Sequence, residues 1–322
     1  MPQTAERLRQ ALAALPLSVE DASCEGAEVA VPGYPGGRPT TVVTLHGGDG
    51  HGTGELVAFA AAEHATFRET IVPRVPRGRG RVDAFVAAAR ALTAGAYERA
   101  ALEAAAIDLA LRQARTSCAR LVELEPRPVR YVVSFGPLLD PMPSVAGAGE
   151  LEVKLDADPR WDAQTLAALA ASGRVAVLDW KGGGERHDHE RLHDALPDAL
   201  VEDPAPAAAP WSPTLRAQLV ADAPVTTAAA ADGAATVNLK PARMGGVFEV
   251  LDAAARCARE GRAVYFGGMW EVGPGRQQLR VLAALLAPDG PNDIAPLVHG
   301  GVRPPRLRVD PATIGFAGGS SA

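Results

Sequence analysis

The sequence contains few cysteines, few aromatic residues and no long hydrophobic run. Its three cysteines, Cys24, Cys118 and Cys257, lie far apart and form no Cys-x-x-Cys pattern. This argues against a disulfide framework or a zinc site and favours a reducing compartment. No apolar run approaches the roughly 20 residues of a membrane span, and the start of the chain lacks a signal-peptide cleavage pattern. We therefore expect a cytoplasmic protein without membrane contact.

The charge balance argues against nucleic acid as a partner. The chain has 32 Lys and Arg residues against 38 Asp and Glu residues, a formal net charge of −6, and no Lys/Arg-rich block. Nucleic acid is therefore not an expected partner, although a local site for a small anion remains open. With 322 residues, 47% of them hydrophobic, the chain is long enough to bury a substantial core in one large domain or two smaller ones.

The first part of the chain predicts a mixed α+β domain over residues 1–125. A Gly-rich segment, Gly47–Glu55, lacks the Gly-Lys-Ser/Thr ending of a phosphate loop, so we interpret it as a hairpin turn. Helical spacing is strongest over Ala96–Arg115, where Ala and Leu dominate. The other expected elements are helices over 1–16, 56–69 and 81–93, and strands over 28–31 and 40–46.

After Pro126 the pattern changes to short β-branched runs that alternate with helical segments, which is typical of βα units around a parallel sheet. About eight strands favour a modified (β/α)₈ barrel over 126–295, and 296–322 form a tail that packs back toward the first domain. A span this short indicates a truncated barrel. The strand-like runs are 129–135, 151–155, 175–178, 199–201, 225–231, 236–239 and 263–266, and the helical ones are 161–171, 185–196, 212–221, 246–260 and 276–287.

Charged residues follow the apolar runs at the ends of the predicted strands. They are Lys154, Asp179, Glu202, Lys240 and Glu271. Because the carboxyl ends of barrel strands meet at one rim, these side chains are expected to lie close together, where barrel enzymes place their chemistry. Any one of them alone is as well explained by a solvated or salt-bridged rim, so the prediction depends on the ordered set.

The chemistry of the set is coherent. Asp179 and Glu202 offer hard oxygen ligands that suit Mg²⁺, with Mn²⁺ as an alternative. Removing a proton next to a carboxylate builds negative charge, which a divalent ion can stabilise as a Lewis acid. Lys154 and Lys240, on different strands, can serve as the acid and base if burial and nearby positive charge lower their pKa values.

These residues also resemble the enolase superfamily, in particular the muconate-lactonizing subgroup. The segment Asn238-Leu239-Lys240-Pro241-Ala242-Arg243-Met244-Gly245-Gly246, with Gly267–Arg276, is similar to the sixth and seventh strand segments of the o-succinylbenzoate synthase/N-acylamino acid racemase family. Val42–Glu55 and Ala100–Ala110 resemble segments of the family's capping domain, and Pro291–Ile294 also resembles a segment of this family. The resemblance covers nearly the whole chain.

The resemblance implies roles for individual residues. Lys154 and Lys240 would be the acid/base lysines; in o-succinylbenzoate synthases the second-strand lysine transfers the proton and the sixth-strand lysine stabilises the enediolate. Asp179 and Glu202 would be metal ligands. Substrate contacts would come from Arg243, Met269 and Glu271, with the capping segments Pro32–Gly37 and Gly48–Thr53 closing over a small carboxylate substrate. Relatives are commonly homo-oligomers.

The sequence departs from the family at three strands. Strand 2 reads Glu152-Val153-Lys154 instead of Lys-x-Lys, and strand 3 reads Asp179-Trp180-Lys181 instead of Asp-x-Asn. These two changes suggest a pairing of Lys181 with Glu152. The third metal ligand should end strand 5, but the expected window holds Thr226, Thr227 and Ala228. Asp222 and Asp232 are the nearest acidic residues, and Asp232, which follows an apolar run, is the predicted ligand.

The leading interpretation is a Mg²⁺-dependent enzyme that abstracts the proton α to a substrate carboxylate, of the o-succinylbenzoate synthase or N-acylamino acid racemase type. Dipeptide epimerisation and muconate-type cycloisomerisation use the same core and stay open. A relative that has lost catalysis and acts as a binding or scaffold protein is the rival from another class. The cluster His187, Asp188, His189 and His193 is interpreted as a set of surface helix residues.

Overall fold

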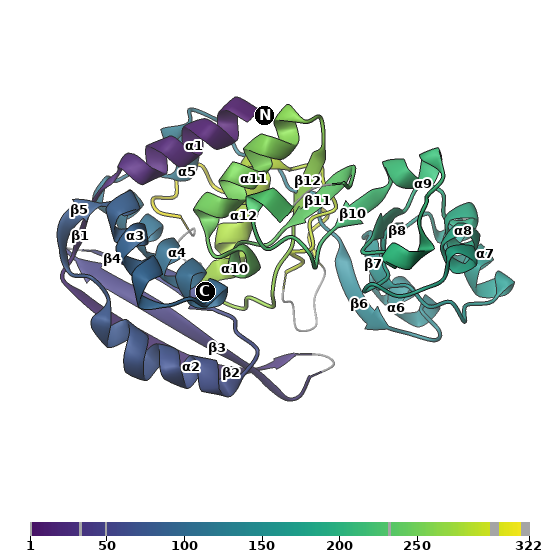
Figure 1. The fold of residues 1–322 in the computed structure, drawn as a ribbon, viewed down its shortest axis with the longest axis horizontal. Helices are drawn as coiled ribbons and strands as arrows, with labels where there is room; N and C mark the ends of the chain where they lie inside the picture. The colour runs from purple at the N-terminus through teal and green to yellow at the C-terminus, as the bar shows by residue number, and fades with distance from the viewer. Residues whose placement is uncertain (1, 32–33, 49, 231–232, 297–302, 317–322) are drawn as a thin grey trace.

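The computed structural model describes residues 2–31, 34–48, 50–230, 233–296 and 303–316. Figure 1 shows an N-terminal α+β domain on one side, the helices α11 and α12 in the middle, and the β6–β9 region with its helices on the far side. Among the described residues, every helix is too short or too polar to cross a lipid bilayer.

The N-terminal domain is built around an antiparallel sheet of three strands in the order β2-β3-β4. A second antiparallel pair joins β1 to β5. The helices pack around these sheets, and the whole domain corresponds to the predicted α+β cap. Its elements are α1 Pro2–Ala14, β1 Pro16–Val19, β2 Asp21–Val31, β3 Tyr34–Gly47, β4 Gly50–Leu56, α2 Ala61–Thr66, η1 Phe67–Ile71, η2 Val72–Arg74, β5 Gly78–Arg81, α3 Val82–Leu92, α4 Ala96–Gln113 and α5 Cys118–Leu121.

The Gly-rich segment has a packing role in addition to its hairpin. Gly47 pairs with Gly50 across the turn, as the sequence predicts, but β4 continues through the remaining glycines. A Cβ atom at Gly52 would lie 2.1 Å from the backbone nitrogen of Leu109, and one at Gly54 would lie 2.0 Å from the carbonyl oxygen of Ala101. The glycines therefore let the Ala-rich helix α4 lie directly on the strand. The closing of Gly48–Thr53 over a substrate stays a prediction.

The second domain contains a parallel sheet in the order β12-β11-β10-β9-β8-β7-β6. Its two edges are joined by parallel bridges from Asn292 to Tyr131 and from Asp293 to Gly267. These two residues take the eighth strand position, so the predicted (β/α)₈ barrel is confirmed. The strands are β6 Val133–Pro137, β7 Val153–Asp156, β8 Val175–Asp179, β9 Leu200–Glu202, β10 Leu219–Ala221, β11 Thr236–Leu239 and β12 Ala263–Phe266.

The barrel is truncated, mainly in its fourth and fifth units. Only α7, α8, α11 and α12 reach ten or more residues in the described part of the barrel, and the connection after β10 contains one short 3-10 turn, η4. The barrel helices are α6 Met142–Gly147, α7 Ala163–Ser172, α8 Arg186–Ala195, η3 Pro206–Ala208, α9 Pro213–Ala217, η4 Ala228–Ala230, α10 Pro241–Met244, α11 Val247–Arg259 and α12 Pro274–Leu286.

The predicted position of strand 5 was wrong. The run 225–231 was expected to be the strand, but residues 225–230 form turns and η4, while the strand is Leu219–Ala221. That strand lies inside the segment predicted as the helix 212–221, which ends at Ala217. A three-residue strand is too short to show the alternation of apolar and polar residues on which the prediction depends.

The barrel does not have a single hydrophobic core. One cluster joins the cap to the β11–β12 side and includes Val237, Leu239 and Phe266. A separate cluster fills the β7–β9 side and includes Leu155 and Leu178. We call the two sides the cap-side half and the distal half.

Carboxylates from the cap anchor the cap-side half. Glu55, at the end of β4, accepts hydrogen bonds from the backbone N–H groups of Val272, Gly273 and Gly275 at 2.8–3.0 Å, at the start of α12. Glu103 of α4 accepts one from Phe248 at 2.6 Å, at the start of α11. Both carboxylates satisfy helix N-termini, where negative charge is favourable.

The C-terminal segment returns to the cap. Gly315 forms a parallel bridge with Ser117. The backbone N–H of Phe316 donates a hydrogen bond of 2.8 Å to Asp108 of α4. The described end of the chain therefore packs against the same helix that covers β4.

Candidate active site

Three buried carboxylates converge at the carboxyl ends of adjacent strands. Asp179 ends β8, Glu202 ends β9, and Asp222 directly follows β10. Each offers an oxygen atom that lies within 4.8 Å of the others. Among the described residues this is the only group of three or more metal-binding side chains that converges in this way. The parallel sheet brings Asp179 and Glu202 to one rim, as the strand-end pattern predicts, and brings Asp222 there as well.

Lys154, the second residue of β7, contacts the first two of these carboxylates. Its Nζ lies 2.6 Å from Oε1 of Glu202 and 2.9 Å from Oδ2 of Asp179. Asp293, from the eighth strand position, lies 3.7 Å away. The side chain of Lys154 is only 2% exposed, so its ammonium group is held almost entirely by carboxylates.

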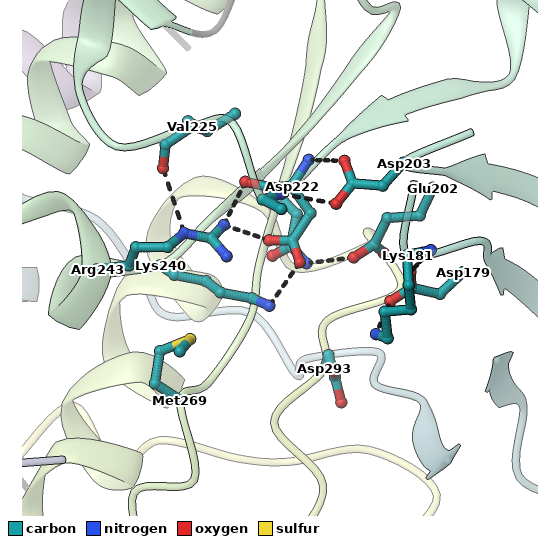
Figure 2. Close-up of polar contacts among 12 residues, drawn as sticks. Asp179, Lys181, Glu202, Asp203, Asp222, Val225, Lys240, Arg243, Met269 and Asp293 are labelled. Carbon is teal, nitrogen blue, oxygen red and sulfur yellow. Dashed lines mark hydrogen bonds and ion pairs between the residues drawn. The ribbon is translucent and has the colours of Figure 1, made fainter. Parts of the chain in front are cut away.

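Lys240 and Arg243 hold the third carboxylate. Lys240 Nζ donates a hydrogen bond of 2.8 Å to Oδ2 of Asp222. Arg243 donates to Oδ1 and to the backbone carbonyl of the same residue, and its Nε lies 3.4 Å from the carbonyl oxygen of Val225. Figure 2 shows Lys240 and Arg243 approaching Asp222 from the same side, opposite Asp203.

Glu202 lies at the centre of the arrangement. Tyr265 of β12 donates a hydrogen bond of 2.5 Å to its Oε2, and Asn238 of β11 donates one of 3.3 Å to its Oε1. Burial raises the pKa of Glu202 to about 8, and the charge of Lys154 opposes that rise. Sequence analysis missed both partners because each lies inside an apolar strand, where the side chain that faces the barrel interior cannot be identified without the register.

Burial and charge act in opposite directions on the other groups. Burial alone would raise the pKa values of Asp179 and Asp222, but the former is lowered by Lys154 and Lys181, and the latter by Lys240 and Arg243. Burial alone would lower the pKa of Lys154, yet the surrounding acids hold it well above its usual value. With the carboxylates not otherwise neutralised, Lys154 is therefore protonated.

A third lysine lies beside the group. Lys181 pairs with Asp179 and lies 3.3 Å from Asp156. The expected pairing with Glu152 is wrong, because that carboxylate pairs with Arg130. Only three of the 32 Lys and Arg residues in the chain are lysines, and all three lie at this rim. This scarcity is the signal in the sequence that would have added Lys181 to the site.

The remaining predicted site residues lie in different places. Asp232, the predicted third metal ligand, falls outside the described residues, and the structure brings Asp222 to the other two carboxylates. Glu271 is 4% exposed and accepts a hydrogen bond of 2.8 Å from the backbone N–H of Met269. Figure 2 shows the Met269 side chain near Lys240 at the edge of the site. Their substrate contacts stay a prediction.

The histidine cluster is not uniformly on the surface. His187 is exposed, but His189 is buried, with its ring centre 3.9 Å from that of Trp180 and 5.0 Å from that of Trp211. Packing between aromatic rings explains its burial, so the surface interpretation is wrong for this residue. These histidines do not converge into a metal-binding group among the described residues.

The donor set fits a hard divalent cation. Asp179, Glu202 and Asp222 provide only oxygen atoms, which is the preference of Mg²⁺, and all three side chains are buried. Lys154 lies between two of them, so its ammonium group must move when a cation is bound.

Solved structures share this architecture. A dipeptide epimerase from Enterococcus faecalis V583 superimposes with a TM-score of 0.76 and 17% identity, covering 94% of this chain and 99% of that one. A dipeptide epimerase from Methylococcus capsulatus, complexed with Mg, gives 0.74 and 20%, covering 94% and 98%. 2-Chloromuconate cycloisomerase from Rhodococcus opacus 1CP gives 0.71 and 17%, covering 94% and 96%. The chain thus has the fold that these three enzymes share.

Family models place the chain more narrowly. The N-terminal domain model of a domain of unknown function (DUF8230) matches residues 10–121, and its C-terminal domain model matches residues 125–300. The chain belongs to this family. No curated protein matches it in sequence.

Proposed function

We propose that this protein is a Mg²⁺-dependent enzyme that abstracts the proton α to the carboxylate of a small substrate. The observation that carries the proposal is the meeting of Asp179, Glu202 and Asp222 with Lys154 and Lys240 at one rim of the barrel. The fold shared with dipeptide epimerases and a cycloisomerase supports it. Within that chemistry, o-succinylbenzoate synthase and N-acylamino acid racemase activities are the first candidates.

The arrangement gives each residue a role. Asp179, Glu202 and Asp222 would hold Mg²⁺, which supplies the positive charge that stabilises a carboxylate losing its α-proton. Lys154 and Lys240 come from the second and sixth of eight strand positions, so they face each other across the rim. A neutral lysine on one face accepts the α-proton and becomes an ammonium ion, while the protonated lysine on the other face returns a proton. For Lys154 to act as the base, the acids around it must be neutralised, because they keep its pKa high.

A dipeptide epimerase is the second candidate, and Asp293 favours it. Its carboxylate comes from the eighth strand position and lies at the edge of the site, 3.7 Å from Lys154 Nζ. An acidic group there can hold the amine of a dipeptide by a charge-assisted hydrogen bond. An Asp293→Asn variant should then lose dipeptide exchange while keeping exchange of N-acylated substrates, which carry no amine charge.

Deuterium exchange tests the proposal directly. The protein with Mg²⁺ in D₂O would be incubated with N-acylamino acids, dipeptides and cyclohexadiene carboxylates, and α-deuterium would be read by NMR. We expect exchange in one class, which disappears when a chelator removes the metal. Magnesium binding without exchange in any class would favour a binding protein. The cytoplasmic location and the self-association expected from the sequence stay predictions.

A further inference from the structure

Asp222 differs from Asp179 in what supports it. Asp179 is followed by α8 of ten residues, whereas the described residues between Asp222 and β11 form only turns, bends and η4. The strand that precedes Asp222 has three residues. A metal ligand at the end of so short an element needs support from elsewhere, because ligand orientation depends on the groups that hold it.

Asp203, the residue after Glu202, provides that support. Its carboxylate accepts hydrogen bonds from the backbone N–H groups of Asp222 at 2.8 Å and Ala223 at 2.7 Å. Figure 2 shows this carboxylate directed at the backbone of Asp222. The side chain of Asp203 therefore holds the segment that carries the third carboxylate.

The backbone of Asp203 adds two further links. Its N–H donates to the carbonyl of Val220 at 3.0 Å, and its carbonyl accepts from Gly182 at 2.8 Å. To make these contacts it adopts a φ of 44°, a left-handed conformation that is uncommon outside glycine but tolerated by aspartate better than by most residues. One residue thus ties the ends of β8, β9 and β10 together.

Arg243 completes the support from the opposite side. It donates to the carbonyl and the carboxylate of Asp222 and reaches the carbonyl of Val225. We propose that Asp203 is a positioning residue that, with Arg243, replaces the missing fifth helix and orients Asp222 for metal binding. This inference rests on the proposed function, because it presumes that Asp222 is a ligand.

The test compares Asp203→Asn with Asp198→Asn. Asp198 is exposed and precedes β9, the strand that Asp203 follows, so it lies at the opposite end of the barrel. Its variant is the matched control. Asparagine keeps the size of Asp203 but has one acceptor oxygen where two are needed. By analogy with other groups that orient ligands, we expect Mg²⁺ affinity, measured by calorimetry, to fall about 10- to 100-fold in Asp203→Asn. The control should bind as the wild type does.

Amide hydrogen exchange provides a second readout without metal. In the metal-free protein, Asp203→Asn should speed exchange at the amides of Asp222 and Ala223, since each loses a charged acceptor. The Asp203→Gly variant keeps the left-handed backbone and lacks the carboxylate, so it should reproduce both effects even if the asparagine variant folds poorly.

The outcomes separate this inference from the proposed function. Absence of Mg²⁺ binding by the wild-type protein would overturn both. Normal wild-type binding with unchanged affinity in Asp203→Asn and Asp203→Gly would overturn the positioning role alone. Unchanged amide exchange at Asp222 and Ala223 would also contradict it.

Discussion

Each half of the barrel rim pairs its buried carboxylates with its own lysine or arginine side chains. In the distal half, Lys154 and Lys181 pair with Asp179, and Lys154 also pairs with Glu202. In the cap-side half, Lys240 and Arg243 pair with Asp222. The hydrophobic cores beneath the two halves are also separate. Each half balances its own acids, and the proposed chemistry needs both.

Polar side chains also link the two halves. From the cap-side half, Tyr265 and Asn238 reach Glu202. From the distal half, Asp203 reaches the backbone of Asp222 and Ala223. Since a metal ion needs all three carboxylates at fixed spacing, these contacts set how well the two halves form one site.

The largest effect is expected from removing either lysine. Lys154→Met removes the acid/base group of the distal half and Lys240→Met that of the cap-side half. Each should lower α-deuterium exchange by about 10²- to 10⁴-fold, the usual contribution of a positioned proton-transfer group, with the melting temperature measured to confirm folding. A variant that kept the full rate would show that one half alone carries the chemistry.

A pH effect is expected at the contact between the cap and the cap-side half. Burial raises the pKa of Glu103 to about 7 from an ordinary 4.5, so the folded state binds this proton more tightly than the unfolded state does. The protonated Glu103 therefore adds to the free energy of unfolding below pH 4.5, and this contribution is lost as the pH rises to about 7. By linkage the contribution amounts to about 3 kcal/mol.

Glu103→Gln, which keeps an acceptor for the N–H of Phe248, should remove this dependence and stabilise the protein above pH 7. Urea unfolding at pH 5 and pH 8 measures it. Glu69→Gln, at an exposed position of the cap, is the control. An unchanged difference between the two pH values in Glu103→Gln would refute the assignment.

A smaller effect is expected from Tyr265→Phe, which removes one contact between the halves. The hydroxyl that donates to Glu202 is lost, and a hydrogen bond to a charged or buried acid contributes about 1.5–3 kcal/mol. The melting temperature and the Mg²⁺ affinity should both fall, whereas Tyr97→Phe in the cap should change neither. Equal behaviour of the two variants would mean that this contact does not join the halves.

Regular βα units were predictable from the sequence, and shortened ones were not. The runs that became β7, β8, β9, β11 and β12 lie next to helices with clear periodicity, and their charged end residues were assigned from that pattern alone. Strand 5 and the eighth strand position have three and two residues, too few to show a pattern. The position of Asp222 depends on the first and the closure of the barrel on the second.

The pairing within the site was also beyond the sequence. Which acid Lys181 contacts depends on the register of β7 against β8, and register follows from packing in three dimensions. Arg130 pairs with Glu152 because Arg130 precedes β6, the strand that lies beside β7. A lone sequence offers residue types at strand ends, but not the partner that each side chain reaches.

A Mn²⁺-soaked crystal tests the central claim most directly, because the anomalous signal locates the ion. The account predicts a single strong peak within bonding distance of Asp179, Glu202 and Asp222, with Lys154 Nζ moved away from Asp179 and Glu202. The peak should disappear in Asp222→Asn. No peak at this rim, or a peak held by other residues, would contradict the account.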